Sequence, residues 1–232
     1  MPRAIKKKVK KKNSGVENEV ADRLYDIKDQ LKNKQKTVLT YGIGSVIVVM
    51  AIAGILLFRY TEGEKSRQIE YEAYKVYFNE YQKRPLSGQE QFQKALDLFQ
   101  QAYNKKKSPR LLFYIANSYA ALGKDDEALK NLNALIKTYS SATDILPLAY
   151  QKIADLQIKK GNKDEALKTL DALYKSNGNI YKDLALVESA RILESQGKKD
   201  EALAKYKELT EKFKDSPFSA EAKAKIEEKK EG

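Results

Sequence analysis

The sequence contains no cysteine and no histidine, and these two absences exclude several kinds of site. Without a thiol there is no disulfide, no cysteine nucleophile and no acylated lipoprotein anchor. Without an imidazole there is no histidine base, and the two absences together exclude a zinc site of the usual ligand types. Neither absence identifies the compartment in which the protein works.

Sequence motifs for nucleotide binding, serine hydrolysis, zinc proteolysis and EF-hand calcium binding are also absent. The acidic residues fall where solvated helix faces and first helical turns are expected. We therefore predict no enzymatic activity, no cofactor and no metal site. Strand patterns are absent too, so the expected class is all-α: one transmembrane helix followed by a solenoid of helix pairs.

Positive charge is concentrated at one end of the chain. The formal net charge is +12, and residues 1–36 hold twelve Lys or Arg against five Asp or Glu. Residues 1–15 carry six of the ten lysines of this region and few apolar residues, which predicts a disordered basic tail. A lysine cluster of this kind fits anionic lipid headgroups, nucleic acid or a solvated topology signal. Because a membrane segment follows, we expect lipid headgroups and do not expect nucleic acid.

Residues 16–36 have the pattern of an amphipathic helix beside a membrane. Apolar residues recur every three or four positions and form one stripe: Val16, Val20, Leu24, Ile27 and Leu31. An interfacial helix lying against the bilayer explains this stripe, and a partner-binding helix is the alternative.

Residues 37–58 contain no charged side chain, which predicts a single transmembrane helix. Twenty-two helical residues span roughly 33 Å, against roughly 30 Å of hydrocarbon. A cleaved signal peptide is the alternative, but a basic region of 36 residues precedes the segment. The flanking charges are more positive upstream, so the positive-inside rule predicts a cytoplasmic N-terminus. In a bacterium, the remaining residues would then lie in the periplasm.

A repeated pattern defines the region from residue 64 to 232. The spacing A-x6-G-x4-A-L occurs three times, at intervals of 38 and 36 residues. The glycines end the first helix of each pair, the alanines let paired helices approach closely, and an acidic pair follows in the first turn of each second helix. The repeat-defining residues are Ala116, Gly123, Ala128, Ala154, Gly161, Ala166, Ala190, Gly197 and Ala202.

These positions resemble the tetratricopeptide (TPR) consensus, whose helix pairs bind protein partners. A weaker copy includes Ala95 and Leu96, and an aromatic stripe of Tyr71, Tyr74, Phe78 and Tyr81 is its expected buried partner helix. In a TPR solenoid the first helix of each pair lines a concave groove. The resemblance places nine residues there: Arg110, Phe113, Asn117, Gln151, Asp155, Ile158, Leu184, Val187 and Arg191. Packing on neighbouring helices is the alternative for the four apolar ones.

The order of segments resembles one family, the bacterial ancillary SecYEG translocon subunit (YfgM-type). The resemblance covers about residues 16–230 and rests on the amphipathic segment, the anchor, the aromatic-rich helix and the repeats. It implies a single-pass inner-membrane protein near the SecYEG translocon that hands translocated clients to periplasmic chaperones. An adaptor for envelope assembly or cell division complexes is the alternative. A ribosome- or nucleic-acid-binding membrane protein, acting through the lysine run, is the second alternative.

Overall fold

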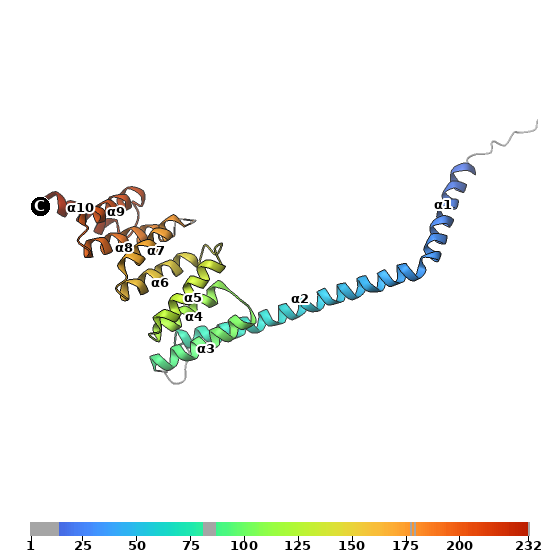
Figure 1. The fold of residues 1–232 in the computed structure, drawn as a ribbon, viewed down its shortest axis with the longest axis horizontal. Helices are drawn as coiled ribbons and strands as arrows, with labels where there is room; N and C mark the ends of the chain where they lie inside the picture. The colour runs from blue at the N-terminus through green and yellow to red at the C-terminus, as the bar shows by residue number, and fades with distance from the viewer. Residues whose placement is uncertain (1–13, 81–86, 177, 179, 232) are drawn as a thin grey trace, which may run out of the picture. The chain divides into compact units, whose positions relative to one another are not determined.

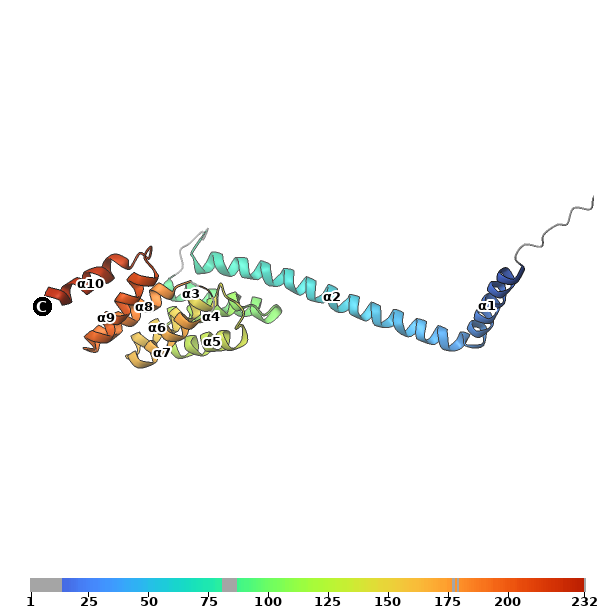
Figure 2. The same cartoon turned by 90° about the horizontal axis from the view of Figure 1, so that it is seen from above.

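The computed structural model describes residues 14–80, 87–176, 178 and 180–231, and it is helical throughout. Within these residues there are ten helices and no strand. The helices, drawn in Figures 1 and 2, are α1 (Ser14–Asn33), α2 (Gln35–Tyr77), α3 (Gly88–Lys105), α4 (Pro109–Ala121), α5 (Asp125–Thr138), α6 (Leu146–Lys159), α7 (Lys163–Lys175), α8 (Lys182–Ser195), α9 (Lys199–Lys212) and α10 (Ser219–Glu231). Most of the predicted basic tail, and Tyr81 of the predicted aromatic stripe, lie outside these residues.

The chain divides into two compact units, Met1–Tyr60 and Thr61–Gly232. In the first unit, α1 and α2 are separated by a single residue, Lys34, and meet at a bend (Figure 1). The amphipathic stripe predicted for residues 16–36 falls on α1, where Val20, Leu24 and Ile27 are each more than half exposed.

The apolar segment predicted for residues 37–58 forms part of α2, and none of its side chains is buried. The helix is long and apolar enough to cross a membrane, judged by length and composition. It does not end with the apolar run, because α2 continues to Tyr77 and its last residues belong to the second unit.

In the second unit, successive helices pack in pairs: α4 with α5, α6 with α7, and α8 with α9. The six alanines that define the repeats are all at most 2% exposed, as their small size requires where two helices approach closely. Leu132, Leu170 and Tyr206, each four residues beyond the second alanine, are also buried. The repeat pattern therefore identifies the residues at which the paired helices touch.

Three glycines end the first helices of the repeats with the same geometry. Gly123, Gly161 and Gly197 have φ angles of 74°, 80° and 75°, as predicted. After each glycine, the next amide donates to a carbonyl five residues back; in the first repeat Lys124 N donates to Tyr119 O at 2.9 Å. This is the Schellman arrangement, which satisfies the terminal carbonyls and turns the chain toward the second helix. Asp or Glu residues occupy the first turn of α5, α7 and α9.

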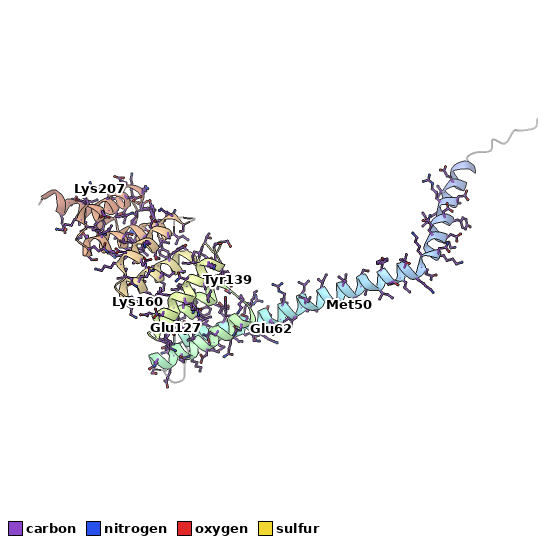
Figure 3. The ribbon with its side chains drawn as sticks, viewed as in Figure 1. Met50, Glu62, Glu127, Tyr139, Lys160 and Lys207 are labelled. Atoms are coloured by element: carbon purple, nitrogen blue, oxygen red, sulfur yellow. The ribbon has the colours of Figure 1, made fainter. Side chains whose placement is uncertain are left out.

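The weaker copy of the repeat pairs the end of α2 with α3. Ser66 donates to the Ala102 carbonyl at 2.8 Å, and Glu62, labelled in Figure 3, forms an ion pair with Lys105 at 3.0 Å. The prediction of a buried aromatic stripe was partly wrong, because Tyr71 and Phe78 are 61% and 53% exposed. Small residues on the adjacent face, such as Ala73, pack against α3 instead, since they allow the closer approach.

Candidate protein-binding face

The first helices of the successive repeats form one continuous face of the second unit. The end of α2 contacts α4 through Tyr74 and Tyr114, whose ring centroids are 4.8 Å apart. Leu112 of α4 and Ala149 of α6 share one core cluster. At the far end, Arg191 of α8 is paired with Glu221 of α10. Between these ends, Ala154 of α6 and Ala185 of α8 share another core cluster. We call this row of first helices the first-helix face.

The polar residues predicted for the groove keep accessible side chains on this face. Arg110, Asp155 and Arg191 are exposed, and Asn117 and Gln151 are partly exposed. Their assignment to a partner-binding groove stays a prediction, because their positions alone do not show what binds there.

Three of the four apolar residues predicted for the groove pack against the core and also keep part of their surface exposed. Phe113, Ile158 and Leu184 are partly buried, and each packs against a core cluster of its own repeat. Val187 is different, because its side chain is 0% exposed and belongs to the core shared by α8 and α9. The assignment of Val187 to the groove was therefore wrong, and the alternative of packing on neighbouring helices holds for this residue.

An aromatic cluster at one end of the face was not predicted as a candidate site. Tyr114 lies at its centre, 5.3 Å from the Tyr77 ring, 5.2 Å from Phe99 and 6.2 Å from the half-exposed Phe78. Burial raises the pKa of the Tyr74 and Tyr77 hydroxyls, so both stay neutral at physiological pH. The only sequence signal for Tyr114 is its place next to Phe113, and the helix pairing that brings α2 against α4 is not visible in the sequence.

Charges at the other end of the face are already paired within the protein. Arg191 donates to both carboxyl oxygens of Glu221, at 2.9 Å and 2.5 Å, and to Glu188 at 2.6 Å. Hydrogen bonding to Arg191 lowers the pKa of Glu221, and this pairing keeps the guanidinium charged. A partner that binds through the Arg191 guanidinium must therefore compete for it with Glu221 of α10, or bind beside that ion pair.

Asp155, at the middle of the face, has no paired cation of this kind among the described contacts. Desolvation raises the pKa of its carboxyl, and the nearby Glu188 adds to this increase, whereas Lys152 opposes it. The face therefore combines aromatic side chains at α2 and α4, an accessible carboxyl on α6 and an arginine on α8 that is already paired with glutamates of the same chain. Such a surface can bind a peptide or helix through apolar contact and hydrogen bonds. Within the described residues, no cluster of three or more metal-ligating side chains occurs.

Several solved structures are similar to this chain, and the first one described here has the same repeat fold. The chain is similar to a Podosopora anserina putative kinesin light chain with nearly identical TPR-like repeats, at 15% identity and a TM-score of 0.51, over 71% of this chain and 84% of that one. It is also similar to MamA, at 14% identity and a TM-score of 0.49, over 69% and 86% of the two chains. YrrB, described as a TPR protein with an unusual peptide-binding site, has 17% identity and a TM-score of 0.45, over 58% and 67%.

A search of curated proteins gave no match. A family model does match, however, and its description is "Tetratricopeptide repeat-like domain". It covers residues 32–228, which include the repeats, the end of α2 and the apolar segment. This match spans most of the 232 residues and, with the helix pairs described above, shows that the chain belongs to the tetratricopeptide repeat-like domain family, whose members serve as scaffolds for protein–protein interactions.

Proposed function

We propose that this protein is a membrane-anchored TPR scaffold, held in a bacterial inner membrane by the apolar part of α2. Its N-terminus would lie in the cytoplasm and its repeats in the periplasm. The observation that carries this proposal is the range of the family match, which begins at residue 32 and runs through the apolar segment into the repeats. Because the family pattern includes the apolar segment, we favour a permanent membrane anchor over a cleaved signal peptide.

Two further observations support the anchor. The apolar segment has no charged residue over 37–58, and every one of its side chains is exposed in the isolated chain. A run of 22 uncharged and mostly apolar residues exposed to water is unfavourable, at roughly 25 cal/mol for each Å² of apolar surface, and a bilayer removes this cost. Lysines upstream of the segment favour the cytoplasmic side for the N-terminus.

For the partner, the resemblance to the ancillary translocon subunit favours the SecYEG translocon, with hand-off of translocated proteins to periplasmic chaperones. The first-helix face, with its aromatic end around Tyr114, is the surface on which we expect clients or chaperones to bind. An adaptor for envelope assembly or division complexes would use the same anchor and the same face.

Single cysteines test the topology cleanly, because the natural chain has none. We expect a membrane-impermeant maleimide to label Lys207→Cys, at an exposed position on α9, in intact spheroplasts. Asp26→Cys on α1 should be labelled only after the membrane is permeabilised. The reverse labelling pattern would contradict the orientation, and recovery of the protein in the soluble fraction would contradict the anchor.

A photocrosslinker on the first-helix face tests the partner. With the crosslinker at Asn117, we expect products that contain periplasmic chaperones or translocating chains, and with one at Leu57 we expect SecY. Arg110→Glu, which reverses an exposed charge beside the aromatic cluster, should reduce the face crosslinks and leave those at Leu57 unchanged. Division or envelope-assembly proteins in place of SecY would favour the adaptor function instead.

A further inference from the structure

The bend between α1 and α2 forms a second feature that the scaffold function does not use. Side chains of the two helices enclose an open hollow of about 820 Å³. Its α1 wall carries Lys28 and Lys32, and its α2 wall is an apolar row that runs from Val38 to Met50. Figure 3 labels Met50 part of the way along α2, and the bend itself is visible in Figure 1.

The two lysines present positive charge on the same side of α1. They are four residues apart, so they lie one helical turn from each other and point to the same wall. Both side chains are exposed, and within the described part of the chain neither ammonium group has an ion-pair partner. Two unpaired ammonium groups at the mouth of an apolar hollow match an anionic group that carries an apolar chain.

The apolar row has the length of one membrane leaflet. Met50 lies twelve positions after Val38, which is about 18 Å along a helix, whereas half of the hydrocarbon core is about 15 Å. The lysines lie at the end of this row where the charge-free segment begins, the level at which headgroups are found. Charge and apolar surface are therefore arranged in the order of a phospholipid molecule.

We propose that this hollow binds one anionic phospholipid, with its phosphate between Lys28 and Lys32 and one acyl chain along α2. The site rests on the proposed membrane anchor, and it is distinct from the lysine run of residues 1–15. Such a lipid would fix α1 against the anchor, because it bridges the two helices.

Glycines along α2 provide a steric test of the acyl-chain position. Gly42 lines the hollow, whereas Gly44, two residues further on, does not. A Cβ atom built at either position has open space around it, with no side chain or neighbouring helix within 4 Å. Gly42→Leu fills the space of the acyl chain, and Gly44→Leu adds the same apolar volume outside it.

The experiment uses the full chain purified in a mild detergent, with bound lipid counted by native mass spectrometry. Phosphatidylglycerol and phosphatidylcholine with identical acyl chains are the probes. We expect one phosphatidylglycerol to bind more tightly than phosphatidylcholine, and Lys28→Gln with Lys32→Gln to weaken it about 30-fold. Lys34→Gln with Lys36→Gln removes the same charge beside the hollow and should change the affinity less than about threefold. Gly42→Leu should weaken both lipids, and Gly44→Leu should weaken neither.

Two results would overturn the site. One is equal binding of the two lipids by the natural chain. The other is an equal loss of affinity in the two double lysine variants, which would show general electrostatic attraction and no specific site. Alkaline carbonate extraction of cell membranes, performed on every variant, separates these results from failure of the anchor. A protein that stays in the membrane but shows no lipid preference contradicts the lipid site alone, whereas an extracted protein contradicts the proposed function.

Discussion

A glycine residue at the end of each first helix has a conformation that other residues adopt at a cost. The positive φ angles of Gly123, Gly161 and Gly197 fall in the left-handed region, where a Cβ atom approaches the following carbonyl oxygen. No neighbouring atom lies within 4 Å of a Cβ built at any of the three. The requirement for glycine therefore comes from the backbone and not from crowding.

Gly161→Ala should accordingly lower the free energy of unfolding by about 1 kcal/mol, the size of the left-handed penalty. Thermal melts followed by circular dichroism, on the full chain in detergent, measure this change. Gly88→Ala is a matched control, since Gly88 opens α3 with no atom near its Cβ position and no positive φ. It should leave the melting temperature unchanged or slightly higher, and an equal loss in both variants would contradict the backbone explanation.

Asp155 is the residue of the first-helix face at which we expect the stability to depend on pH. Its pKa is raised by desolvation, so the folded protein binds this proton more tightly than the unfolded chain does. The free energy of unfolding therefore falls as pH rises through the folded-state pKa of this carboxyl. Asp155→Asn should raise the melting temperature at pH 7, and the difference should shrink as the pH is lowered. A variant that melts earlier at pH 7 would show that the carboxylate is stabilising instead.

At the scale of the element, the helices begin by different means. α3 begins with a capping box, in which Ser87 Oγ accepts from the Glu90 amide at 3.3 Å and the Glu90 carboxyl accepts from the Ser87 amide at 3.2 Å. α4 also has serine at its N-cap, Ser108, but makes no side-chain cap bond there and has proline in its first turn. The same residue type therefore has two different roles at these two positions.

Ser87→Ala should destabilise the second unit by about 1 kcal/mol, because the Glu90 amide in the first turn of α3 loses the hydroxyl oxygen that accepts its hydrogen bond. Ser108→Ala should cost only a few tenths of this amount. Chemical denaturation of the two variants, measured side by side, tests the difference. Equal costs would mean that the capping box does not contribute to the stability of α3.

At the scale of the whole molecule, the second unit is expected to fold without the first. Its core clusters are supplied by residues from Ala73 onward, and each repeat buries its face on its neighbours. The end of α2 is part of this core, because Ala73 and Val76 pack with Phe99 and Leu111. The unit therefore needs the last turns of α2 in addition to the recognisable repeats.

A fragment of residues 61–232 should be soluble, helical and cooperative in its melt, as judged by circular dichroism and light scattering. A fragment of residues 88–232 lacks the end of α2 and exposes the faces of Leu96, Phe99 and Leu111. It should melt earlier or aggregate. Equal stability of the two fragments would show that α2 adds nothing to the fold of the repeats.

The sequence determined the repeat architecture, because its evidence is local. The A-x6-G-x4-A-L spacing identifies the glycines that end helices and the alanines at which helices touch, and all are found in these roles. The apolar segment is equally local, since a run without charge needs no partner to be recognised. Its role as a membrane anchor, the domain boundaries and the partners stay predictions.

Tertiary structure decided which residues on the first helices are accessible. Val187 and Phe113 occupy equivalent positions in the repeat pattern, yet Val187 is fully buried and Phe113 only partly. The end of α2 shows the same effect, since Tyr71 is exposed while Ala73 is buried. Helical periodicity fixes the relative directions of side chains on one helix. Which direction faces the core depends on how neighbouring helices approach, and this depends on side-chain volumes that come from distant parts of the chain.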